Sequence, residues 1–152
     1  MLNVKLDNSH VTINDDSRTK KSVLEKSASI LSTSTGIDVD IIFNKLYERE
    51  KLGSTSVGNG VALPHARLKG IDIPFISVVV LEEAVDFDNI DDFDVDIVVC
   101  LIVPFEHTED HLELLSSLSQ ILDRISNRKK IRNSRNSTEV ISSLKSENLN
   151  YI

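Results

Sequence analysis

Residues 95–103 read VDIVVCLIV, a nearly continuous run of Val, Ile and Leu, and this run decides the fold class. A second run, IPFISVVVL, lies at residues 73–81. Apolar runs without polar alternation are typical of strands that are covered on both faces. Two such strands in the middle of the chain therefore predict a central sheet with helices packed against both of its sides.

Helical patterns flank the two predicted strands. Residues 19–31 form one pattern, which Gly36 would end, and a second begins after the N-cap candidate Asp38. Residues 109–125 predict a third helix, and a last one would start at Ser137 or Thr138. The second helix has an apolar stripe expected to face the core, made of Val39, Ile42, Phe43, Leu46 and Tyr47. Helices, then strands, then helices, without regular βαβ alternation, predict an α/β fold with a single central mixed β-sheet sandwiched between helices.

Composition excludes several classes of protein. The 152 residues fit one domain, which we place at residues 1–152. A formal net charge of -7 and the absence of tryptophan argue against nucleic-acid binding. No apolar run approaches the ~20 residues of a membrane span, so no membrane insertion is expected, and no secretory signal is recognisable. The one cysteine, Cys100, lies in an apolar run, which predicts a buried thiol in a reducing compartment and hence a cytoplasmic protein.

Two of the four histidines are candidates for chemistry. His65 follows Pro64 at the end of a short apolar segment, which would place it at the rim of the sheet, where α/β proteins keep their sites. A functional role and a structural role for His65 are equally open on these grounds. His111 lies in the first turn of the helix predicted at 109–125, where anions are favoured, although packing or capping is the more common role there. We expect His10 and His107 to lie at the surface.

A metal site is not predicted. His65 and His111 have no third ligand at a convincing spacing. The acidic residues at 86–96 alternate with apolar ones, which indicates a solvated turn leading into a strand, and they lack the glycine and terminal glutamate of a calcium loop. The basic residues at 128–135 are interpreted as a solvated helical face, with docking of a partner as the alternative.

Two motifs carry a family resemblance. Residues 47–55 read YEREKLGST and residues 58–65 read GNGVALPH. Together they resemble the enzyme IIA domain of the fructose–mannitol class of the bacterial phosphoenolpyruvate:sugar phosphotransferase system. The likeness covers about residues 15–146 and continues through residues 87–88, 95–96, 101–104 and 111–112. Within the family, the chain is most similar to the stand-alone nitrogen-regulatory enzyme IIA, because it is one domain long and has Asn59 where mannitol-type domains tend to have an acidic residue.

The resemblance implies a role for each matching residue. His65 matches the phosphorylated histidine, His111 the second active-site histidine, and Arg49 an active-site arginine. The backbone of the glycine-rich segment at 53–60 would complete the phosphate cradle. The residues expected to form this phosphate-binding loop are Ser54, Thr55, Gly58, Asn59 and Gly60. The family often has glycine directly after the phosphorylated histidine, whereas this chain has Ala66.

The implied activity is a phosphoryl relay without a metal, nucleotide or other cofactor. The phosphorylated histidine phosphocarrier protein of the system would donate to His65. Phospho-His65 would then act as a signal to regulatory target proteins, or pass the group to a IIB domain if the chain is a sugar-specific enzyme IIA. A degenerate protein-binding module without phosphotransfer and a metal-dependent hydrolase that uses His65 and His111 are the alternatives from other classes.

Overall fold

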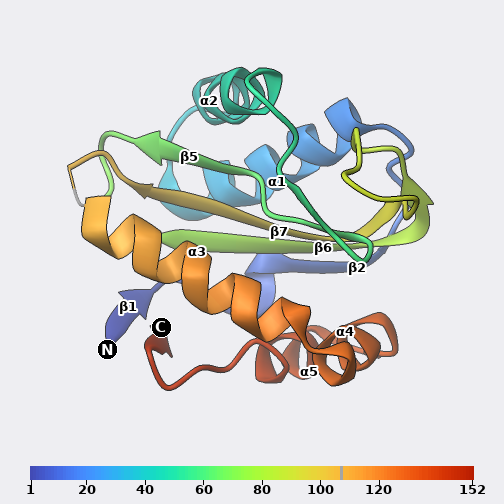
Figure 1. Ribbon diagram of the computed structural model, residues 1–152. Helices are drawn as coiled ribbons and strands as arrows, with labels where there is room; N and C mark the ends of the chain where they lie inside the picture. Colours follow the sequence, from blue (N-terminus) through green and yellow to red (C-terminus); the bar gives the residue numbers. More distant parts are fainter. Residues whose placement is uncertain (107) are drawn as a thin grey trace.

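The computed structural model describes residues 1–106 and 108–152 as three layers (Figure 1). A six-stranded mixed sheet forms the middle layer. Helices α1 and α2 cover one face, and α3, α4 and α5 cover the other. The predicted α/β fold with a central mixed β-sheet between helices is confirmed. In addition, the ends of the chain form a small parallel pair of strands outside this sheet, β1 (Leu2–Val4) and β8 (Leu149–Tyr151).

Strand β7 (Val95–Pro104) is the centre of the sheet. It runs antiparallel to β6 (Phe75–Val85) on one side. On the other side it pairs in parallel with two short strands in succession, β4 (Val61–Ala62) and β5 (His65–Leu68). The outer strands are β2 (Val11–Asp15), parallel to β6, and β3 (Ser56–Gly58), antiparallel to β4. The two long runs of the sequence are thus the two central strands.

The helices follow the predicted pattern with one change. Their bounds are α1 (Lys20–Thr35), α2 (Val39–Lys51), α3 (Thr108–Asp123), α4 (Ile125–Arg132) and α5 (Ser137–Ser142), with a 3-10 turn, η1, at Asn8–His10. Gly36 ends α1 with a φ of 77°, and the Asp38 carboxylate accepts from the Asp40 N–H at the start of α2, as expected. The helix predicted over 109–125 instead ends at Asp123, and Arg124 adopts an extended conformation before α4 begins.

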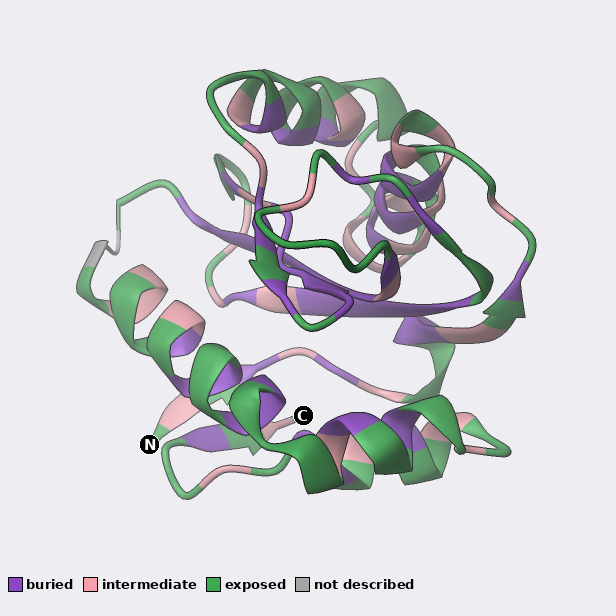
Figure 2. Cartoon of the chain, turned by 45° about the vertical axis from the view of Figure 1, so that its right-hand side comes forward, coloured by how far each residue is buried: buried purple, intermediate pink, exposed green. Residues whose placement is uncertain are grey.

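The core consists of two apolar layers, one on each face of the sheet (Figure 2). Side chains of β7 alternate between them: Leu101 packs on the α3 side, whereas Cys100 and Ile102 pack on the α1 side. Burial raises the pKa of the Cys100 thiol to about 12, so the thiol is an inert core group. The prediction of a buried cysteine is confirmed.

Helix α2 packs against α1 and β5 through a narrower stripe than predicted. Ile42 and Leu46 are fully buried, but Val39 and Tyr47 are 39% and 37% exposed. The prediction was therefore wrong for the two ends of the stripe. Because α2 lies over α1 and the short strand β5 rather than flat on the whole sheet, only its middle contacts the core. The last turn of α2 lies beside the start of β5, and this arrangement positions the candidate site.

His10 is buried, and the expectation of a surface histidine was wrong. Its Nδ1 lies 2.8 Å from the Ile76 carbonyl oxygen and its Nε2 lies 2.7 Å from the Ser34 hydroxyl. Both ring nitrogens therefore have partners, which makes His10 a structural residue linking η1 to β6 and α1. His107 lies outside the described residues.

The charged segments also have their places in the fold. Asp86 and the residues of 91–94 are exposed in a turn that leads into β7, as predicted. In the basic segment, Arg128 is buried and donates to the carbonyl oxygens of Leu122 and Asp123, so it is not part of a solvated face. Arg132 pairs with Asp96 at 2.9 Å. Within residues 1–106 and 108–152, no helix is long and apolar enough to cross a membrane.

Candidate active site

His65 opens a strand instead of ending one. Strand β4 stops at Ala62, and β5 starts at His65, which pairs with Leu101 of β7. The side chains of β5 then alternate, with Ala66 and Leu68 buried in the core and His65 and Arg67 turned outward. His65 is half-buried, with its backbone fixed by the central strand of the sheet.

A hydrogen bond defines the tautomer of His65. Its Nδ1 lies 2.8 Å from the carbonyl oxygen of Leu63. A carbonyl can only accept, so Nδ1 carries the proton, and in the neutral ring Nε2 keeps its lone pair. Burial, and next the positive charge of Arg49, lower the pKa of His65, although the bond to Leu63 and the charge of Glu50 act in the opposite direction. His65 is therefore a neutral imidazole with a nucleophilic Nε2 at neutral pH.

His111 contacts His65 from helix α3. It lies in the first turn of α3, and the two ring centroids are 5.4 Å apart with the planes at 78°. Burial lowers the pKa of His111, and the charges of His65 and Arg67 lower it further. A neutral His111 still has one N–H to donate to a group held between the two rings.

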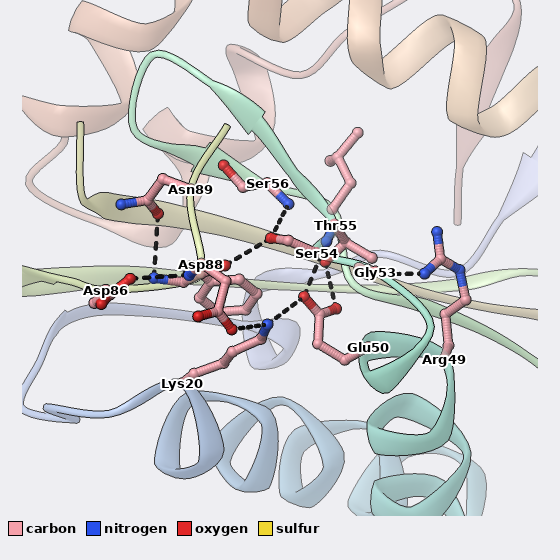
Figure 3. A network of polar contacts seen from close by, with 12 residues as sticks. Lys20, Arg49, Glu50, Gly53, Ser54, Thr55, Ser56, Asp86, Asp88 and Asn89 are labelled. Atoms are coloured by element: carbon pink, nitrogen blue, oxygen red, sulfur yellow. Dashed lines mark hydrogen bonds and ion pairs between the residues drawn. The ribbon is translucent and has the colours of Figure 1, made fainter. Parts of the chain in front are cut away.

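Arg49 completes this set from the last turn of α2. Its Nη1 donates to the Gly53 carbonyl oxygen at 2.9 Å, which holds the guanidinium close to the turn after the helix (Figure 3). Arg49, His65 and His111 line one cleft of about 350 Å³. The remaining lining residues are Lys45, Glu48, Leu52, Ala66, Arg67 and Phe105. The structure thus brings together three residues that the sequence singled out from positions far apart in the chain.

Glu50, next to Arg49, holds the segment that follows helix α2 (Figure 3). Its carboxylate is buried and accepts from the backbone N–H of Thr55 at 2.9 Å and from the Thr55 hydroxyl at 2.7 Å. Lys20 of α1 lies 2.9 Å from the same carboxylate and 3.0 Å from Asp88. Because one buried carboxylate joins α2, α1 and the segment after Gly53, it fixes the end of the helix that carries Arg49.

We expect Glu50→Gln to lower the free energy of unfolding by about 1–3 kcal/mol, because an amide retains one bond to Thr55 but loses the charge that Lys20 faces. Asp88→Asn is the matched control, since Asp88 pairs with the same lysine from a side chain that is 77% exposed. It should cost less than about 1 kcal/mol. Urea unfolding of both variants measures this, and equal costs would contradict a special role for the buried carboxylate.

The expected phosphate-binding loop does not line the cleft. None of Ser54, Thr55, Gly58, Asn59 and Gly60 is among the lining residues. The hydroxyls of Ser54 and Thr55 bond to the Phe87 carbonyl oxygen and to Glu50.

The residues at 58–60 form the tight turn between β3 and β4. The Asn59 N–H donates to the Asp91 carboxylate, and a side chain on Gly60, at a φ of 79°, would meet Arg132 at 2.5 Å. These glycines therefore serve close packing of the turn.

Arg67 and Phe105 are cleft residues that the sequence did not reveal. Arg67 is two residues after His65, and residues at that spacing share one face of a strand. The sequence shows no pattern for β5, which is only four residues long, so this spacing carried no information. Among the described residues, no group of three or more His, Cys, Asp or Glu side chains could hold a metal ion.

Comparison with protein families agrees with this geometry. The family model described as "Phosphoenolpyruvate-dependent sugar phosphotransferase system, EIIA 2" matches residues 5–147. The chain belongs to this family. It is a phosphotransferase-system component, and the resemblance drawn from the motifs is confirmed.

Individual relatives of this EIIA 2 chain include nitrogen regulatory proteins and a mannitol-type protein. A "Nitrogen regulatory protein" of Pseudomonas aeruginosa is 43% identical over 121 residues, 79% of each chain. The crystal structure of the nitrogen regulatory protein IIA-Ntr of Neisseria meningitidis has a TM-score of 0.88 at 32% identity and covers 91% of this chain and 95% of that one. The IIA mannitol protein of Escherichia coli shares the fold with a TM-score of 0.78 at 19% identity, over 93% of this chain and 99% of that one.

Proposed function

We propose that this EIIA 2 chain carries a phosphoryl group on Nε2 of His65. The observation that supports this most is the bond from Nδ1 to the Leu63 carbonyl oxygen, which leaves Nε2 as the nitrogen with a lone pair. The lowered pKa keeps that lone pair free at neutral pH. Arg49 and His111 lie in the same cleft, and Arg49 provides the positive charge that a phosphoryl group needs.

The donor in this proposal is the phosphohistidine of the system's phosphocarrier protein. The Nε2 lone pair of His65 forms a new N–P bond while the donor's N–P bond breaks, and the electron pair of that bond returns to the donor imidazole. Phosphoryl transfer depends mainly on alignment and charge stabilisation. Arg49 binds phosphoryl oxygens with its planar fork, and the His111 N–H donates to a third. No metal, nucleotide or other cofactor takes part.

We assign the chain to regulation of the nitrogen type, in the cytoplasm, where phosphorylated and unphosphorylated forms bind different target proteins. Identity of 43% to the Pseudomonas aeruginosa nitrogen regulatory protein supports this assignment. The second candidate is a sugar-specific enzyme IIA that passes the group to a IIB domain. Its support is the fold likeness to the mannitol protein.

Phosphorylation by the complete relay tests the proposal. The chain is incubated with phosphoenolpyruvate, the first enzyme of the system and its phosphocarrier, and its intact mass is measured. We expect a gain of one phosphoryl group per chain. An unchanged mass under conditions that phosphorylate a known enzyme IIA would instead identify a protein-binding module without phosphotransfer. Transfer onward to an added IIB domain would favour the sugar-specific candidate.

We expect Arg49→Lys to be phosphorylated at least about tenfold more slowly with an unchanged melting curve. Lysine keeps the charge but loses the two-pronged grip on phosphoryl oxygens. Arg49 makes a single hydrogen bond to Gly53, at the surface, so its loss should change the free energy of unfolding very little. Arg135→Lys, at an exposed position remote from the cleft in sequence, is the control. A stable Arg49→Lys protein that accepts phosphate at the wild-type rate would remove Arg49 from the site.

A further inference from the structure

The cleft has a second arginine, Arg67, which comes from a different element than Arg49. Arg67 follows His65 by two residues on the outward face of β5, roughly 7 Å further along the strand. Its backbone is fixed by the pairing of Arg67 with Val103 of β7. The position of Arg67 relative to His65 is therefore set by the sheet and not by a loop.

The guanidinium of Arg67 is held by Phe105. Its centre lies 4.7 Å from the centroid of the Phe105 ring, and its Nη2 donates to the Phe105 carbonyl oxygen. A cation stacked on a ring loses less side-chain freedom when it binds a ligand than one that moves freely in water. Its positive charge also contributes to the lowered pKa of His111, so its field extends to that histidine.

We propose that Arg67 is a second phosphate-binding residue, which together with Arg49 holds the phosphoryl group of phospho-His65 from two sides of the cleft. Arg49 comes from α2 and Arg67 from β5, with His65 and His111 in the same cleft. Two guanidinium groups balance the two negative charges of a phosphoryl group. The inference rests on the proposed phosphorylation of His65 and adds a residue to it.

The sequence offers a matched control in Lys69. It lies in the turn directly after β5 and over the same Phe105 ring, at 5.4 Å, but it does not line the His65 cleft. Lys69→Gln therefore removes a neighbouring exposed cation of the same surface without touching the site. Arg67→Gln and Arg67→Lys remove the guanidinium with and without loss of charge.

Two phosphoryl donors distinguish a role of Arg67 in phosphate binding from a role in docking of the phosphocarrier protein. One is the phosphorylated phosphocarrier; the other is phosphoramidate, a small donor whose P–N bond breaks to release ammonia as the bond to His65 Nε2 forms. We expect Arg67→Gln to be slower with both donors by about tenfold or more. This loss is smaller than the 10²–10³-fold typical of an enclosed donor, because Arg67 is exposed. Arg67→Lys should be intermediate, and Lys69→Gln should match the wild type with phosphoramidate.

Phosphorus NMR of the loaded proteins gives a second readout. Removal of a nearby cation should raise the pKa of the phosphoryl group in Arg67→Gln but not in Lys69→Gln. Slowing with the phosphocarrier alone would make Arg67 a docking residue and overturn the inference. Wild-type rates with both donors would overturn it as well. A wild-type protein that neither donor phosphorylates would instead overturn the proposed function itself. Urea unfolding of each variant identifies any loss that comes from misfolding.

Discussion

His65→Ala is expected to abolish phosphorylation while the fold is retained. In the proposed mechanism the imidazole supplies the nucleophile. His65 is the histidine of the cleft whose Nδ1 is bonded to a backbone carbonyl, which leaves Nε2 free. The side chain is half-buried, so its loss should cost only about 1 kcal/mol through the unpaired Leu63 carbonyl oxygen. Intact mass after incubation with the complete relay measures the effect.

His65→Gln is the matched variant for this prediction. Its amide can still donate to the Leu63 carbonyl oxygen, but it cannot form an N–P bond under these conditions. It should fold like the wild type and remain unphosphorylated, which separates the local hydrogen bond from the nucleophile. Phosphorylation of either variant at the wild-type rate would place the acceptor elsewhere in the chain.

His111→Ala is expected to slow phosphorylation by about 10²–10³-fold without abolishing it. His111 lies edge-on to His65 at 5.4 Å between ring centroids, where its N–H can stabilise charge on the phosphoryl group during transfer. It does not form the covalent bond, so some transfer should persist through Arg49 and His65. Single-turnover kinetics with the phosphorylated phosphocarrier measure the rate.

His111→Gln distinguishes hydrogen bonding from packing. The amide restores an N–H donor of similar reach, so this variant should recover part of the rate that His111→Ala loses. Leu112→Ala, an exposed neighbour on the same turn of α3, is a control for local disturbance of the helix. Equal rates for the wild type and His111→Ala would reduce His111 to a packing residue.

Much of this fold could be predicted because its longest strands are continuous apolar runs and its longer helices have clear boundary residues. The runs at 73–81 and 95–103 are the two central strands, and Gly36 and Asp38 mark real helix boundaries. Strands of two to five residues, such as β4 and β5, are too short to show a pattern, so their pairing with β7 could not be predicted. His10 was placed wrongly because a polar segment folds against β6, which only tertiary contacts reveal.

The candidate site, too, could be predicted only in part. Arg49, His65 and His111 could be named from their motifs, and the structure brings them to one cleft. The glycine-rich turn at 58–60 resembled a phosphate cradle, yet its bonds go to Asp91 and Arg132. Arg67 could not be found because its relation to His65 depends on β5. A motif identifies chemical groups, whereas their distances depend on the pairing of strands.

The most direct test is the nitrogen that carries the phosphoryl group. The protein is prepared with ¹⁵N-labelled histidine, phosphorylated by the phosphocarrier, and examined by NMR for coupling between phosphorus and the ring nitrogens. The account predicts coupling to Nε2 of His65, with Nδ1 still protonated and bonded to the Leu63 carbonyl oxygen. Phosphorus on Nδ1 of His65, or on His111, would contradict it.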